Sequence, residues 1–142
     1  MSFIIRSMLH DGDGPLVGSD DNMLGVRVPP HPRADVTLDE DGYVSPAAGG
    51  LSINQDWKRM HVNHIPSRYK HLVMDARGSN KKSLWQLGSL AFANGPISDG
   101  LELRITSENH GLIEAAEKMM IDKFQGLLQD TRPQWSAFEP SA

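Results

Sequence analysis

The residues best suited to chemistry lie in the segment 35–53, which ends in the elbow Gly49-Gly50-Leu51-Ser52. Two consecutive glycines allow a sharp bend and let the backbone approach a ligand closely. Ser52 follows within a short apolar run, so its hydroxyl must be bonded inside the protein or face a ligand. Taken alone, these residues are explained slightly better by an ordinary turn whose serine bonds to backbone. The segment is nevertheless the first candidate for one wall of a ligand site.

Histidines offer a second kind of chemistry. His110 follows the alternating apolar and polar run 101–106, and a histidine at the end of a strand can transfer protons or simply face water. Three histidines in the segment 61–71 have spacings that a metal ion could use on a helix, but Pro66 interrupts any helix that would carry all three. The sequence therefore predicts no metal site.

Other common motifs are missing from the sequence. The aspartate-rich turns 11–14 and 39–42 lack the glutamate that an EF-hand places after its glycine. The chain has no P-loop, no Rossmann G-x-G-x-x-G and no G-x-S-x-G nucleophile elbow. Cysteine is absent, which excludes disulfides, thiolate zinc sites and cysteine nucleophiles.

Length and composition fit one globular domain. The chain has 142 residues, of which 39% are hydrophobic and 23% charged, and a chain of this size can bury a core without covalent staples. The first residues lack the pattern of a signal peptide, and no apolar run approaches the roughly 18 residues of a membrane span. We therefore expect action in the cytosol and no membrane partner.

Charge is distributed unevenly along the chain. The formal net charge is −4, and because nucleic-acid binding normally requires a basic excess, a nucleic-acid partner is not favoured. The segment 58–82 nevertheless holds seven of the fourteen basic residues. It is either a solvated basic face or a local patch for an anion such as a pyrophosphate or an RNA backbone.

The pattern of short apolar runs indicates an α+β fold. Strands are expected at 3–9, 51–54, 71–74 and 101–106, and a hairpin at Asp41-Gly42 is expected to pair 35–38 with 43–44. Periodicity does not decide between helix and strand for 83–92, whereas it predicts one helix over 112–129. Residues 1–132 are expected to form a single catalytic-type domain. The tail 133–142 is expected to fray, although Trp135 and Phe138 can dock.

Three blocks resemble a known family. The segment from Asp35-Val36 through Asp41-Gly42 to Gly49-Gly50-Leu51-Ser52-Ile53 resembles the middle of type VI secretion effector toxins with an ADP-ribosyltransferase-like fold. Residues 110–119 are similar to the late strand of that family, H-x-x-I-x-P, and the methionine that opens its last helix, with Ala115 in place of the proline. Phe3-Ile4-Ile5-Arg6 resembles its first strand, which carries an arginine.

The resemblance implies an ADP-ribosyltransferase-like α+β fold, in which short strands form a split or curved sheet with one C-terminal helix. It also implies a strand at 112–114 that pairs with 101–106, and a helix that begins near Lys118. This contests the single helix over 112–129, and we expect the strand because Gly111 is a poor helix start. The implied function is that of a cytotoxic, NAD-dependent ADP-ribosyltransferase that acts on an intracellular target and is delivered by a secretion apparatus.

The resemblance also implies how NAD would be held. Arg6 would bind the phosphate or the ribose, since a guanidinium offers bidentate donors. Gly49, Gly50 and Ser52 would form the wall on the nicotinamide side.

The catalytic residues implied are Ser52, His110 and Glu114. His110 would bond the ribose or relay a proton, and Glu114, with Glu108 as its substitute, would stabilise the positive charge that develops as the nicotinamide leaves. Two alternatives stay open: an NAD glycohydrolase on the same fold, and a non-catalytic binding module of the immunity or adaptor type. The resemblance further implies a cognate immunity protein or antitoxin and a macromolecular acceptor that the sequence does not identify.

Overall fold

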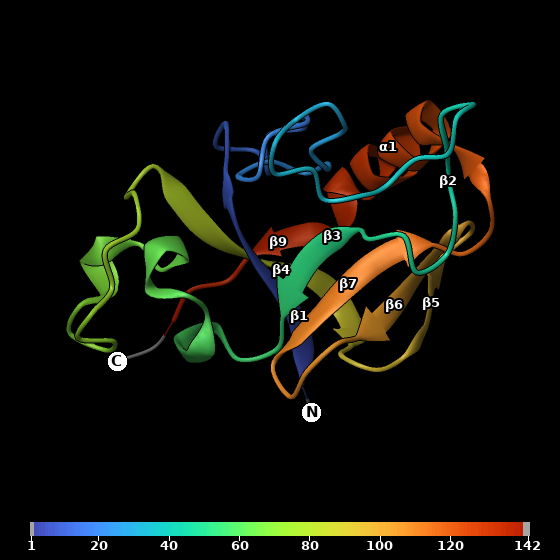
Figure 1. The fold of residues 1–142 in the computed structure, drawn as a ribbon. Helices are drawn as coiled ribbons and strands as arrows, with labels where there is room; N and C mark the ends of the chain where they lie inside the picture. Colours follow the sequence, from blue (N-terminus) through green and yellow to red (C-terminus); the bar gives the residue numbers. More distant parts are fainter. Residues whose placement is uncertain (1, 141–142) are drawn as a thin grey trace.

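The computed structural model describes residues 2–140 and shows a curled antiparallel sheet with one helix near the C-terminus (Figure 1). Its seven strands have the order β5-β6-β7-β3-β1-β4-β9. Their bounds are β1 Phe3–Leu9, β3 Leu51–Asn54, β4 Lys82–Ala91, β5 Gly95–Ser98, β6 Leu101–Ile105, β7 His110–Ala115 and β9 Trp135–Ala137. Strands β2 (Tyr43–Val44) and β8 (Met119–Met120) form a separate pair, and α1 spans Ile121–Asp130. The expected α+β class is confirmed.

Each face of the sheet covers a hydrophobic core. On one face, Phe124 and Leu128 of α1 pack with inward side chains of the strands, such as Ile4 and Ile53. On the other face lies a lobe formed by residues 56–82, which contains the short 3-10 helices η1 (Trp57–Arg59), η2 (Val62–His64) and η3 (Ser67–Tyr69). The lobe and the sheet share a second, smaller core, which consists of Ile5, Trp57, Met60, Ile65, Tyr69, Ala76 and Leu84.

The sheet is split between β1 and β3. Strand β1 pairs with β4 along most of its length, but its register with β3 consists of the pair Ile5 and Asn54. Beyond that pair the Arg6 side chain bridges the two strands, since its Nη1 donates to the carbonyl of Ser52 over 2.8 Å. A side chain thus takes the place of ladder hydrogen bonds between β1 and β3.

The helix predicted over 112–129 is wrong in its first half. Residues 110–115 form strand β7, which pairs with β3 and β6, and α1 begins only at Ile121. Gly111 and Ile113 are buried while His110 and Leu112 are only partly buried, which is the period-two pattern of a strand whose one face meets the core. The expected strand at 112–114 and its pairing with 101–106 are therefore confirmed. The helix, expected to begin near Lys118, begins three residues later, at Ile121.

Two other predictions along the chain are wrong. Residues 71–74 form turns rather than a strand, and Met74 is 85% exposed. The turn at Asp41-Gly42 exists, but Tyr43–Val44 pairs with Met119–Met120 instead of with 35–38. Residues 35–38 instead lie beside the elbow, where Val36 and Gly49 form a bridge. Pairing with β8, which is distant in the sequence, takes the place of the local hairpin.

The undecided and terminal segments also take defined positions. Residues 83–92 lie almost entirely within strand β4, and the expectation of a frayed tail is wrong for β9, which pairs with β4. Trp135 is 4% exposed, and its indole Nε1 donates to the hydroxyl of Thr131 over 3.0 Å. No helix within residues 2–140 is long and apolar enough to cross a membrane.

Candidate functional site

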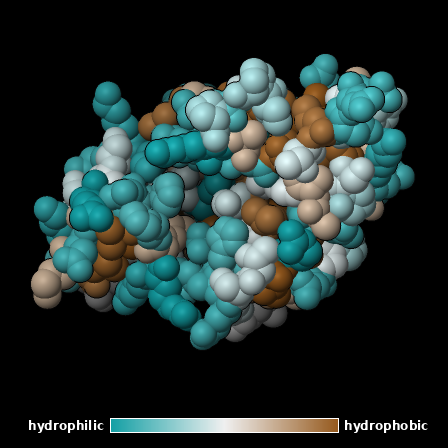
Figure 2. Space-filling model, in the orientation of Figure 1, coloured by the Kyte–Doolittle hydropathy of each residue, from teal (hydrophilic) through white to brown (hydrophobic). Residues whose placement is uncertain are grey.

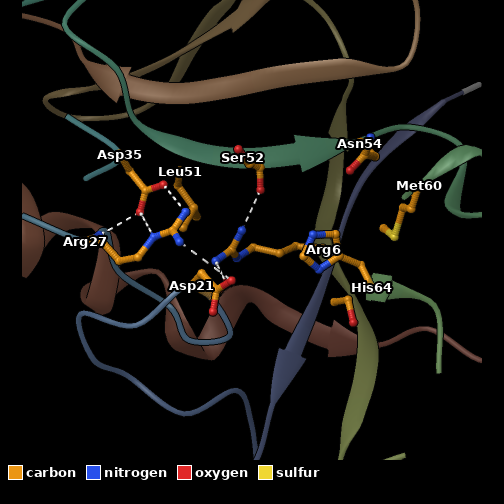
Figure 3. A pocket seen from close by; sticks show the side chains of 10 residues that line it. Arg6, Asp21, Arg27, Asp35, Leu51, Ser52, Asn54, Met60 and His64 are labelled. Carbon is orange, nitrogen blue, oxygen red and sulfur yellow. Dashed lines mark hydrogen bonds and ion pairs between the residues drawn. The ribbon is translucent and has the colours of Figure 1, made fainter. Parts of the chain in front are cut away.

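A polar cavity of about 110 Å³ occupies the split between β1 and β3. Figure 2 shows the molecule hollowed between the lobe and the body of the sheet, and Figure 3 shows the residues around the cavity at close range. The lining comes from β1, β3, the lobe and the irregular segment between β1 and β2. The residues are Arg6, Ser7, Asp21, Arg27, Asp35, Leu51, Ser52, Asn54, Met60 and His64.

Arg6 is the central cation of this cavity. It is 9% exposed, and its Nη2 donates to the carbonyls of Asp21 (2.8 Å) and Met23 (3.0 Å), while Nη1 donates to that of Ser52. Burial lowers the pKa of Arg6 to about 10, although Asp35 and Asp21 act to raise it. The guanidinium stays charged at neutral pH and has no carboxylate hydrogen-bonded to it, so its charge is available to an anion.

Two buried polar atoms at the cavity have no partner. They are Nε of Arg6 and Oγ of Ser7, and the described residues contain a single further buried side-chain atom of this kind, Nε1 of Trp85. A buried donor without a partner costs about 1–3 kcal/mol. Two adjacent residues of β1 carry this cost in the same cavity, which indicates that a hydrogen-bonding ligand supplies the missing acceptors.

The irregular segment 10–42 closes the cavity on one side and is held there by an ion pair. Nε and Nη2 of Arg27 donate to the two carboxylate oxygens of Asp35 over 3.1 and 2.9 Å, and the backbone N–H of Arg27 donates to the same carboxylate over 2.7 Å. Asp21 lies farther from Arg27, at 3.8 Å from Nη1. The carboxylate of Asp35 is thus occupied by three hydrogen bonds from Arg27, whereas the carboxylate of Asp21 makes only the longer contact with Arg27.

The lobe contributes positive charge to the same region. The ring of His64 borders the cavity (Figure 3), and desolvation together with the charges of Lys82 and Arg6 lowers its pKa. Lys82 is buried, and its Nζ donates to the side chain of Asn22 and the carbonyl of Asn63, both over 3.2 Å. Desolvation lowers the pKa of Lys82 as well. The lining itself holds two arginines and two aspartates, so Lys82 is the cation that adds to the charge of Arg6 near the cavity.

The structure brings Arg6 and Ser52 together but gives the glycines of the elbow a different position. Gly49 has φ 102°, and a Cβ there would collide with the carbonyl of Asp35. A Cβ on Gly50 would collide with the carbonyl of Ile113 in β7. Neither glycine lines the cavity. Both glycines allow backbone segments to pack closely, and this packing fixes Ser52 at the cavity wall. The glycines themselves do not contact the cavity.

The predicted catalytic residues of β7 lie outside the cavity. His110 is opposite Asn54 in the register of β3 and β7, and its Nδ1 contacts the hydroxyl of Thr106. Glu114 is 1% exposed, and Arg104 donates to both of its carboxylate oxygens, over 2.7 and 3.1 Å.

Glu108, the substitute carboxylate, also lies away from the cavity. It is exposed and pairs with Arg59 at 3.1 Å. Of the residues predicted as the site, Arg6 and Ser52 alone line the cavity, and neither glutamate does.

Sequence reasoning missed Ser7, Asp21, Arg27 and His64. Ser7 adjoins Arg6 in an apolar run, and a second polar residue there was a usable signal, because a buried hydroxyl needs a partner. Asp21 and Arg27 lie in a segment without periodicity. Only its fold over the split sheet brings them to the cavity, so no local pattern could have identified them.

A second cavity, of about 380 Å³, lies at the other end of β1 and includes Phe3, Trp57 and Phe138 in its wall. It is the larger of the two, but its one cation, Arg59, is already paired with Glu108. None of the unpartnered buried atoms belongs to its lining. We therefore take the smaller, polar cavity as the candidate site.

No protein-family model matches this chain, and no curated protein sequence matches it either. Residues 2–140 contain no group of three or more histidine, aspartate or glutamate side chains placed to hold a metal ion. The chemistry of the cavity, together with the resemblance in sequence, is therefore the basis for a proposal of function.

Proposed function

We propose that this chain binds NAD through its diphosphate at the split between β1 and β3 and transfers the ADP-ribose group to an intracellular acceptor. The observation that carries the proposal is the pair of unpartnered, buried polar atoms, Nε of Arg6 and Oγ of Ser7, in one cavity that contains a buried guanidinium. The Nε–H of Arg6 and the hydroxyl of Ser7 could each donate to an oxygen of the diphosphate, and a charged donor strengthens such hydrogen bonds.

The size of the cavity limits what it can hold. Sites for drug-sized ligands measure about 300–1,000 Å³, whereas this cavity measures about 110 Å³. It therefore accommodates one fragment, such as the phosphate groups, and the rest of NAD would lie over the open side of β3 and the lobe. Ser52 is exposed on that side, so its hydroxyl is placed to contact the nicotinamide ribose.

The carboxylate for such a reaction has two candidates. The resemblance assigns the role to Glu114, but Arg104 neutralises that side chain and would have to move away first. Asp21 lines the cavity itself, and its ion pair with Arg27 is long, at 3.8 Å. A carboxylate near the reacting ribose stabilises the oxocarbenium-like transition state electrostatically. We therefore propose Asp21 as the charge-stabilising group, in place of Glu114.

The test is NAD consumption by the purified protein and four variants. Ser52→Ala and Asp21→Asn are expected to abolish consumption, and Ser7→Ala to weaken NAD binding about 10-fold or more through the loss of one hydrogen bond to an anion. Ser98→Ala, a change at an exposed serine of β5, serves as the control and retains full activity. Consumption unchanged by both Ser52→Ala and Asp21→Asn would refute the mechanism.

A non-catalytic binding module is the second candidate, and the Arg104–Glu114 pair favours it because that pair removes the expected catalytic acid. In that case the protein binds ADP-ribose but leaves NAD intact. An NAD glycohydrolase is distinguished by its product, which is free ADP-ribose rather than ADP-ribose attached to a macromolecule.

The resemblance extends the proposal to toxicity. Expression inside a bacterial cell is expected to arrest growth and deplete NAD, and co-expression of a cognate immunity protein to restore both. Growth arrest that persists in the Ser52→Ala and Asp21→Asn variants would contradict a role for NAD in the toxicity.

A further inference from the structure

We propose that the lobe is a docking surface for the phosphodiester backbone of a nucleic acid, and that this nucleic acid is the acceptor presented at the cavity. The first part of this proposal, the docking of nucleic acid, depends on the lobe alone. The second part, that the nucleic acid is the acceptor, rests on the proposed function. The acidic net charge of the whole chain argues against such a partner until the charges are located in the fold.

The charges of this protein are separated in space. The lobe, residues 56–82, holds seven of the fourteen basic residues and two of the eighteen acidic ones, Asp56 and Asp75. The rest of the chain therefore carries a large acidic excess. Such a distribution attracts a polyanion to the lobe and repels it from the other faces, so it directs binding even though the net charge is −4.

The basic side chains of the lobe other than Lys82 are exposed and, with one exception, are not neutralised. Lys58, Lys70, Arg77 and Lys81 are exposed, and no carboxylate pairs with any of them among the described residues. The exception is Arg59, which pairs with Glu108. A face that served solubility alone would gain from mixed signs, whereas several unpaired cations on one lobe form a phosphate-binding footprint.

The two central arginines of the lobe are also held in place by neutral groups. Arg68 lies over the ring of Tyr69, with its guanidinium carbon 4.8 Å from the ring centroid, and its Nη1 donates to the carbonyl of Asn80 over 3.0 Å. Nε of Arg77 donates to Oδ1 of Asn63 over 2.7 Å. These contacts fix the guanidinium groups without cancelling their charge, and a planar, pre-positioned guanidinium suits a phosphate.

The lobe adjoins the candidate site. Met60 and His64 belong to both the lobe and the lining of the cavity, and Figure 2 shows a hydrophilic surface on the lobe side of the hollow. A nucleic acid bound along the lobe would therefore pass the opening at which a reacting ribose would lie. The large aromatic side chains of the lobe, Trp57 and Tyr69, are buried, so we expect recognition of the backbone rather than stacking of bases.

The test measures binding of fluorescein-labelled 20-nucleotide RNA and DNA, single-stranded and duplex, at several salt concentrations and without NAD. The lobe variant carries Lys58→Gln, Lys70→Gln and Lys81→Gln. The matched control carries Arg33→Gln, Lys118→Gln and Lys123→Gln, which changes the net charge equally but lies outside the lobe. Circular dichroism and thermal unfolding verify that both variants fold.

We expect the lobe variant to bind at least about 10-fold more weakly and to lose roughly 2 from the slope of log affinity against log salt, since each phosphate contact contributes about 0.7–0.9. The control is expected to remain within about 2-fold of the original protein. Equal loss in both variants, no binding at 50 mM salt, or preference for polyglutamate or anionic vesicles over nucleic acid would each overturn the docking proposal.

The acceptor half is tested by adding NAD with a radiolabelled adenylate to the bound nucleic acid. Label on the nucleic acid, reduced in the lobe variant, supports it. Binding that persists while NAD stays intact would refute the proposed function and leave the docking surface standing. NAD consumed with label on protein alone would overturn the acceptor assignment.

Discussion

Replacement of Arg6 by methionine is the most informative single perturbation, because Arg6 joins the two halves of the sheet and also provides the charge of the cavity. Methionine keeps an unbranched apolar stem but lacks the guanidinium, so it removes every hydrogen bond of the side chain. The three carbonyls of Ser52, Asp21 and Met23 then lose their donor. Stability and ligand binding are expected to fall together.

The magnitude follows from two opposing terms. A hydrogen bond to a charged group contributes about 1.5–3 kcal/mol, so three of them contribute roughly 5–9 kcal/mol. Against this, burial lowers the pKa of Arg6 from its ordinary value to about 10, which corresponds to a penalty on the charged form of about 3 kcal/mol at 1.36 kcal/mol per pKa unit. Water entering the cavity can bond the freed carbonyls. We expect a net loss of about 2–5 kcal/mol in the free energy of unfolding.

The assay is urea unfolding followed by tryptophan fluorescence, with ADP-ribose affinity measured by calorimetry under folding conditions. Arg6→Lys is expected to be intermediate in stability, since one ammonium cannot reach the carbonyls on both sides of the split. Arg33→Met, at an exposed arginine, serves as the control and is expected to change neither quantity. An Arg6→Met variant within 0.5 kcal/mol of the original protein that still binds ADP-ribose would refute the reasoning.

Three further predictions concern the elbow, the histidine of the cavity and the tail. Gly50→Ala is expected to lower the free energy of unfolding, measured in urea, by about 2–4 kcal/mol, because the new Cβ would collide with the carbonyl of Ile113. Gly126→Ala serves as the comparison: Gly126 lies in open space on α1, so this change should raise the free energy of unfolding by about 0.5–1 kcal/mol. The lowered pKa of His64 predicts that ADP-ribose binds more tightly as pH falls below 6.5, because protonation adds a cation while the diphosphate charge stays constant; His64→Ala should flatten this calorimetric profile. Trp135→Ala is expected to cost about 3–5 kcal/mol by opening the core under β9, and an unaltered unfolding midpoint would contradict that packing.

The sequence predicted best those elements whose pattern is local. The apolar runs 3–9, 51–54 and 101–106 all became strands, since alternation or continuous burial over a few residues is sufficient evidence for a strand. Residues 112–120 cannot be assigned to helix or strand from apolar periodicity alone. Their apolar positions satisfy a helical period as well as a strand period, and only the partners β3 and β6, distant in sequence, decide in favour of the strand.

The candidate site was predictable in part for the same reason. Arg6 stands out as a charge within an apolar strand, and Ser52 as a hydroxyl beside a double glycine. Their proximity depends on the splitting of β1 from β3, which no residue pattern signals. The resemblance assigned a catalytic role to Glu114, but Glu114 is paired with Arg104. The register of β6 and β7 places Arg104 opposite Leu112, diagonally beside Glu114, and no local pattern signals that register.

The energetics of Arg6 argue that the cavity serves a ligand rather than the fold alone. Taking a charge out of water is costly, so a buried arginine is poor evidence for a purely structural purpose. The three carbonyl bonds offset its burial, yet its Nε and the neighbouring Ser7 Oγ still lack partners. Of the three unpartnered buried side-chain atoms in the described residues, two fall in this single cavity of about 110 Å³. A phosphate-sized anion would satisfy both donors and the charge at once. Binding of ADP-ribose that is abolished by Arg6→Met and weakened by Ser7→Ala, but is insensitive to Glu114→Gln, is the pattern that this argument requires.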